Sequence, residues 1–147
     1  MFDMRIKSLF FDRPKVMRAT DRATLRVLSK AGAFIRQRAK TSIRRRKGSA
    51  PPGSPPHSHE GSLRRLILFG YEPARKTVVV GPARFKQGEV PPLLEFGGTI
   101  ARTRRTRRGK TRRYTARYRS NPFIGPALEK ELPSLPKLWA QSVRPET

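Results

Sequence analysis

Residues 101–119, ARTRRTRRGKTRRYTARYR, hold ten Lys or Arg among nineteen positions and neither Asp nor Glu. Two kinds of side chain alternate toward the end of this stretch: one parity carries Tyr114, Ala116 and Tyr118, and the other carries Thr and Arg. A period of two is typical of a β-strand. Gly109, between Arg108 and Lys110, tolerates the positive φ that a tight hairpin turn needs. The stretch therefore predicts an extended basic β-hairpin arm.

So dense a run of cations repels itself, which implies a polyanion or an acidic protein surface as its counterpart. The candidate contact residues are Arg102, Arg104, Arg105, Arg107, Arg108, Lys110, Arg112, Arg113, Arg117 and Arg119. In one interpretation the first eight face a DNA channel and touch phosphates without sequence preference. In another, the arm docks on an acidic face of a neighbouring subunit or ring by pairing strand edges. A solvated, flexible loop is the third alternative, and the tyrosine alternation argues against it.

The composition of the whole chain points the same way. Its 147 residues include 34 Lys or Arg and 10 Asp or Glu, for a net charge of +24, and its length suits one domain. An apolar fraction of 35% with 14 prolines leaves a modest core. Nucleic acid or a strongly acidic assembly is the expected environment. The chain has no cysteine, which excludes disulfides, thiolate catalysis and cysteine-based metal sites.

The sequence contains no signal for a membrane. No run approaches the roughly 18 apolar residues that span a bilayer. The N-terminal MFDMRIKSLFFD lacks the long apolar core of a signal peptide. We therefore expect a soluble protein with no membrane partner, made inside the cell.

The first half of the chain predicts a short strand over 4–11 and a long helix over 12–47. Asp12 followed by Pro14 is a suitable helix start. One amphipathic stripe recurs at spacings of three and four: Val16, Ala19, Ala23, Val27, Ala31 and Phe34, widened by Leu28 and Ile35. The cations of residues 44–47 would then lie at the negative end of the helix dipole.

The second half predicts a connector, a small sheet, the arm and a last helix, giving an α+β fold. Residues 48–61 are rich in Pro, Gly and Ser and should form a surface connector. Within a sheet segment at 62–100, residues 62–71 and 76–81 should pair as strands. The C-terminal helix should lie within 122–143 and start at Pro126, with Pro133 and Pro136 breaking or kinking it. Its apolar side should carry Leu128, Leu132, Leu135 and Trp139.

Sites for catalysis or cofactors have little support. His57 and His59 form an H-x-H with Glu60 beside them, but a proline-rich loop without cysteine is a poor tetrahedral zinc site. The glycines fit neither a P-loop nor a dinucleotide fingerprint. Glu129 and Glu131 differ by two positions and would face different sides of a helix. We expect no catalytic residue, no cofactor, no metal and no enzymatic activity.

Four short motifs occur in an order that resembles a family of tail-component proteins of long-tailed bacteriophages, the head-tail joining or tail completion proteins of the neck. They are GSLRRLI at 61–67, VVVGP at 78–82, PLLEFGGT at 92–99 and NPFIGPALEKEL at 121–132. The positions that match the family's motifs are Glu95, Phe96, Gly97, Pro122, Phe123 and Pro126. This chain departs from the pattern in its long proline-rich connector, its second glycine at Gly98 and its arginine-dense arm.

The resemblance implies a structural protein of the virion, assembled in the host cytoplasm. It would form a hexameric ring between the head-completion or connector proteins and the tail tube or tail terminator, with genomic DNA in the channel contacted without sequence preference. Within such a ring, Glu95 would be the partner of an arginine, either at an interface or within the domain. A free basic nucleic-acid-binding protein is the alternative, since arginines interleaved with Tyr114 and Tyr118 would suit stacking on single strands.

Overall fold

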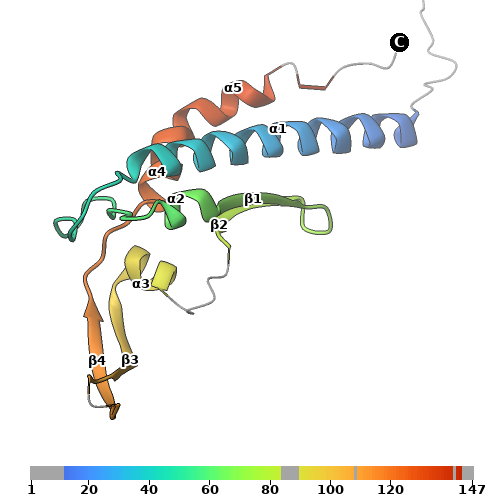
Figure 1. The fold of residues 1–147 in the computed structure, drawn as a ribbon. Coiled ribbons are helices and arrows are strands. Elements are labelled where there is room, and N and C mark those ends of the chain that lie inside the picture. The colour runs from blue at the N-terminus through green and yellow to red at the C-terminus, as the bar shows by residue number, and fades with distance from the viewer. Residues whose placement is uncertain (1–11, 84–89, 108, 141, 144–147) are drawn as a thin grey trace, which may run out of the picture.

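A computed structural model describes residues 12–83, 90–107, 109–140 and 142–143, and the strand expected over 4–11 lies outside them. The fold is α+β, as expected. A long helix packs on a two-stranded hairpin and a broken C-terminal helix, and a second hairpin projects from this body (Figure 1). No helix within the described ranges is both long enough and apolar enough to cross a membrane.

The long helix α1 (Arg13–Ser42) starts where the sequence predicts. The carboxylate of Asp12 accepts a hydrogen bond from the backbone N–H of Lys15 at 3.0 Å and caps the helix, and Pro14 lies in the first turn. The buried stripe consists mainly of small residues four apart: Ala23, Val27, Ala31, Ile35 and Ala39. Such a row lets neighbouring elements approach the helix backbone closely.

The prediction that Val16 and Phe34 belong to the buried stripe is wrong, since these side chains are 43% and 41% exposed. The ammonium of Lys76, at the tip of the first hairpin, lies 2.6 Å from the carboxylate of Asp21. The turns of α1 before Asp21 therefore extend past the hairpin, and Val16 lies beyond the strands that cover the later turns. Ile35 is the side chain that enters the core, and its neighbour Phe34 is directed elsewhere by the 100° step of the helix.

The helix ends earlier than expected, at Ser42. Ile43 adopts extended backbone and is only 1% exposed, and Arg44 forms a β-bridge with His57. The N–H of Ser58 donates to the carbonyl of Arg44 at 3.0 Å. Burial of Ile43 and this bridge outweigh the helix propensity of the basic run. Residues 44–47 therefore do not occupy the last helical turn, which holds only Lys40 among cations.

The first hairpin is confirmed over part of its expected length. Strand β1 (Ile67–Glu72) pairs antiparallel with β2 (Thr77–Pro82), with Ile67 opposite Pro82. Residues 62–66 were expected to be strand but form a short helix, α2 (Ser62–Leu66). Leu63 and Ile67 are four apart and both buried, a spacing that suits a helical turn entering the core.

The segment expected as sheet up to residue 100 also contains a helix, α3 (Val90–Phe96). Pro91 and Pro92 occupy its first turn, where a missing N–H costs nothing. The described strands form two separate two-stranded sheets and not one continuous sheet.

The C-terminal helix is broken at the prolines, as expected. It comprises α4 (Gly125–Glu131), a 3₁₀ turn η1 (Leu132–Ser134) that contains Pro133, and α5 (Leu135–Trp139), and it stops short of residue 143. The side expected to be apolar faces outward, since Leu128, Leu132 and Trp139 are 40%, 50% and 43% exposed. Ala127 and Glu131 are buried instead, and Glu131 forms an ion pair with Arg38 of α1.

The core lies where α1, α2, β1 and α4 meet. Its largest fully buried side chains are Ile43, Ile67 and Phe123, packed with Ile35, Leu63 and Ala127. These elements come from three separate parts of the sequence, since α2 runs directly into β1, and the core therefore holds the two halves of the chain together.

Gly32 sets the distance between α1 and the first hairpin. A Cβ built on Gly32 would lie 2.6 Å from Cγ2 of Val78 and 2.9 Å from Cδ2 of Phe69, both too close for real contacts.

We expect Gly32→Val to destabilise the fold by about 1 to 3 kcal/mol, because the added methyl groups must push the hairpin off the helix. Chemical denaturation measures this change. Gln37→Val on the exposed side of the same helix is the control and should cost only a few tenths of a kcal/mol in helix propensity. Equal effects of the two changes would contradict close packing at Gly32.

Candidate nucleic-acid interface

The basic arm is a hairpin, as the sequence predicts. Strand β3 (Gly98–Arg105) pairs antiparallel with β4 (Thr111–Tyr118), from Gly98 opposite Tyr118 to Arg105 opposite Thr111. The turn is closed by the N–H of Thr106, which donates to the carbonyl of Lys110 at 2.8 Å, and Gly109 has φ 77°. Figure 1 shows this hairpin projecting away from the body of the molecule.

The register divides the arm into two chemically different faces, since cross-strand partners share a face. The tyrosine face carries Ile100, Arg102, Arg104, Arg112, Tyr114, Ala116 and Tyr118. The threonine face carries Thr99, Ala101, Thr103, Arg105, Thr111, Arg113, Thr115 and Arg117. The cations expected to face one channel are therefore split between both faces.

The remaining candidate cations lie off the strands. Arg107 and Lys110 belong to the turn, Arg119 follows the end of β4, and Arg108 lies outside the described residues.

On the tyrosine face, Arg104 is directly opposite Arg112, a like-charge pair that opposes hairpin formation. Residues 97–121 contain no acidic side chain to offset it, so the counter-charge must come from elsewhere.

The tyrosine face is partly covered near its base. Ile100, Arg102, Ala116 and Tyr118 are half-buried, and the guanidinium of Arg102 lies 5.5 Å from the centre of the Tyr118 ring. This cation–π contact occupies one side of the ring. Tyr114, nearer the tip, is 46% exposed and remains open to a partner.

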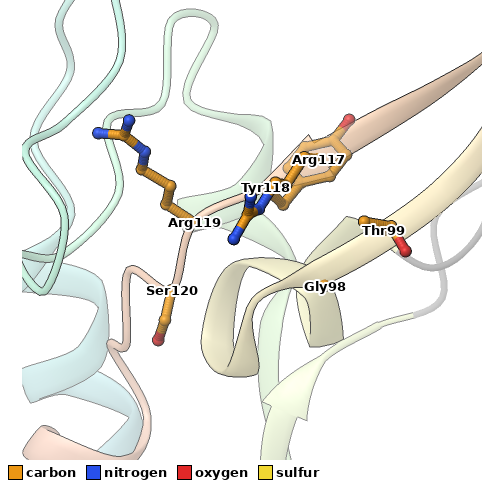
Figure 2. A pocket seen from close by; sticks show the side chains of 6 residues that line it. All are labelled: Gly98, Thr99, Arg117, Tyr118, Arg119 and Ser120. Atoms are coloured by element: carbon orange, nitrogen blue, oxygen red, sulfur yellow. The ribbon is translucent and has the colours of Figure 1, made fainter.

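A pocket of about 550 Å³ lies at the base of the arm, lined by both strands and the two residues that follow β4 (Figure 2). In this view Arg119 extends away from the strand pair, on the side opposite Thr99.

The chain enters β3 through Gly97 and Gly98, with φ 76° and 139°, values that other residues rarely adopt. A side chain at Gly97 would also crowd the backbone N of Ser120, at 3.2 Å.

Glu95 fixes the base of the arm to the body. Its carboxylate accepts hydrogen bonds from the backbone N–H groups of Phe123 at 2.9 Å, Ile124 at 3.1 Å and Gly125 at 2.8 Å. These donors lie at the positive end of the α4 dipole, where a carboxylate is favoured. Within the described residues of this chain, the partners of Glu95 are these backbone donors and not the arginine that the sequence predicted.

Asn121 extends this anchor to the connector. Its N–H donates to the carbonyl of Leu94 at 2.7 Å, and its side-chain amide donates to the carbonyls of Pro51 at 2.6 Å and Ser54 at 2.7 Å. The connector over 48–61 is irregular, as expected, but these bonds hold it against the arm base. Asn121 is buried, and its neighbour Ser120 donates from its hydroxyl to the carbonyl of Glu95 at 2.8 Å.

The motif residues singled out from the sequence have different roles in the structure. Phe123 is 1% exposed and belongs to the core, so it is not an interface residue. Pro122 and Pro126 flank it at the start of α4, and Gly97 forms the turn into β3. Phe96 is 82% exposed beside the arm base, which leaves a large apolar ring available to another molecule.

Sequence reasoning did not find a second basic cluster, the Lys40 pocket, which is formed by Lys40, Arg45, Arg64 and Arg65. None of these residues belongs to the arm. The basic runs at 44–47 and 64–65 were visible in the sequence, but their meeting depends on the early end of α1 and on the helical turn at 62–66.

In the part of the chain that the structure describes, no three His, Cys, Asp or Glu side chains gather as a metal site would require.

Comparisons with protein-family models, with curated proteins and with solved structures find no match to this chain. The resemblance to phage neck proteins therefore remains a prediction from the four motifs.

We expect Glu95→Ala to lower the free energy of unfolding by about 2 to 4 kcal/mol, because three backbone donors lose their acceptor. Urea denaturation followed by circular dichroism measures this loss. Glu129→Ala is the matched control, an exposed carboxylate on α4, and should change stability by less than about 0.5 kcal/mol. A Glu95 variant as stable as the Glu129 variant would rule out the anchoring role.

Proposed function

We propose that this protein is a structural component of a tailed-phage virion that assembles as a ring in the neck and joins the tail to the DNA-filled head. The ring is proposed to be hexameric and to contact head-completion or connector proteins on one side and the tail tube or terminator on the other. Its role is assembly and not catalysis.

The threonine face of the arm is the observation that carries this proposal. It presents Arg105, Arg113 and Arg117 among four threonines, with no carboxylate on either strand. Guanidinium and hydroxyl groups are the side chains that contact phosphates without reading bases. The opposite face also carries three arginines, but it adds Ile100, Ala116 and two tyrosines, which suit packing against protein. The arm is thus suited to lie between a polyanion and a neighbouring subunit.

The distribution of apolar side chains supports assembly. Among the described residues, ten apolar residues are buried while thirteen large ones are exposed. The exposed set includes Phe96, Leu128, Leu132 and Trp139. An isolated two-stranded hairpin is only marginally stable in water, so the arm also gains from a neighbour. A subunit within a multimer satisfies both requirements.

The alternative is a free nucleic-acid-binding protein, for which Tyr114 would stack on a base. The contact between Arg102 and Tyr118 weakens this reading, since it occupies one of the two rings. The two functions differ in what the protein does without other virion proteins: a free binder would have high affinity for a defined nucleic acid in physiological salt and would not join a ring.

The two faces of the arm can be tested separately with variants that remove equal charge. We expect Arg105→Gln with Arg113→Gln to reduce the slope of log affinity for duplex DNA against log salt by about 2, because two phosphate contacts are lost. Arg104→Gln with Arg112→Gln, on the tyrosine face, should reduce it by less than about 1. Salt titrations of DNA binding give both slopes. A larger loss from the second pair would overturn the assignment of the threonine face to DNA.

The joining role is tested by electron microscopy of particles assembled with and without this protein. We expect filled heads and finished tails to lie apart when it is missing, and to join when the purified protein is added back. Complete particles in its absence would reject the neck role. The Arg105 and Arg113 variant, added back in the same way, should leave joining impaired.

A further inference from the structure

The Lys40 pocket, away from the arm, gathers four cations from three segments of the chain. Lys40 comes from the last turn of α1, Arg45 from the stretch that follows it, and Arg64 and Arg65 from α2. The pocket has a volume of about 610 Å³, and Ser58 and Glu60 also line it.

The backbone under these cations is fixed. Ile43 and Leu63 are 1% and 7% exposed, so the segments that carry Arg45 and Arg64 are anchored in the core. The bridge between Arg44 and His57 ties the first segment to the pocket wall at Ser58. The cluster is therefore a built surface and not a chance meeting of flexible chain ends.

The lining of the pocket carries four cations and a single carboxylate, that of Glu60. None of Lys40, Arg45, Arg64 and Arg65 forms an ion pair with an acidic residue of the described ranges. Burial lowers the pKa of Lys40, and the neighbouring charges of Arg36 and Arg64 lower it further. A bound anion would relieve this repulsion between like charges.

A second copy of this chain offers few free carboxylates among its described residues, namely Glu60 and Glu129. The carboxylates of Glu95 and Glu131 are engaged by backbone donors and by Arg38, and Asp21 is paired with Lys76. Asp12 caps α1 and Glu72 lies near Arg75. Two isolated carboxylates match four clustered cations less well than a molecule that is rich in negative charge does.

We propose that the Lys40 pocket binds phosphate groups of a nucleic-acid backbone, without regard to sequence and independently of the arm. Three arginines around a lysine suit this ligand, because the guanidinium fork donates two parallel hydrogen bonds to phosphate oxygens. The inference rests on the proposed function only in taking nucleic acid as the polyanion. It gives each subunit a second contact on the same duplex.

The test compares two full-length variants that each lose four positive charges. The pocket variant carries Lys40→Gln, Arg45→Gln, Arg64→Gln and Arg65→Gln. The control variant carries Arg13→Gln, Lys15→Gln, Arg18→Gln and Arg26→Gln, exposed positions toward the other end of α1. We expect the pocket variant to reduce the salt slope of duplex DNA binding by about 2 to 3, and the control by less than about 1. Equal reductions would overturn the proposal.

Two further measurements keep the outcome clear. Inorganic phosphate, compared with chloride at equal ionic strength, should raise the melting temperature of the wild type and of the control variant more than that of the pocket variant. If the fourfold variant does not fold, Arg65→Gln alone should still lower the salt slope by about 0.9. Tighter pocket-dependent binding of polyglutamate than of duplex DNA would overturn the assignment to phosphate. Particles that assemble without the protein would reject the neck role while leaving this result intact.

Discussion

The carboxylate of Glu95 joins the base of the arm to the start of α4. It lies at the end of α3, directly before the turn into the arm, and it accepts three hydrogen bonds from the start of α4. Phe123, one of its donors, is also the largest fully buried side chain of the core. The orientation of the arm relative to the body therefore depends on one carboxylate, together with the bonds from Asn121 to Leu94 and to the connector.

This arrangement separates a hydrogen-bonded anchor at the base of the arm from the charged surface of the arm itself. The anchor uses backbone donors and acceptors, which need no counter-charge from outside. The arm beyond it has cations on both faces and at its tip, and two of them oppose each other directly at Arg104 and Arg112. Repulsion along the arm disfavours its compact state in isolation and favours it beside a polyanion. Binding and ordering of the arm are thus coupled by its charge, which is the physical basis of the proposed role in a DNA-carrying ring.

The Lys40 pocket adds a second electropositive site on the body. The arm places its arginines on projecting strands, whereas the pocket places them around a hollow with a buried floor. The exposed rings and chains of Phe96, Leu132 and Trp139 lie on other elements and suit contact with protein. Under the proposed function, the arm and the pocket would contact a duplex at two points and leave apolar surface for neighbouring subunits.

Local patterns were enough to predict the arm, its turn at Gly109, the capped start of α1 and the break at Pro133, because each depends on alternation or on the backbone preference of a few adjacent residues. The sequence also located Glu95 and the 121–126 motif, but it predicted an arginine as the partner of Glu95. Hydrogen bonds to backbone groups distant in sequence produce no recognisable pattern of residue types. Only tertiary packing decided that α1 ends at Ser42, that residues 62–66 form a short helix, and that Lys40 lies near Arg64. In each case burial of Ile43, Leu63 or Ile67 in a shared core outweighed the local preference of the chain.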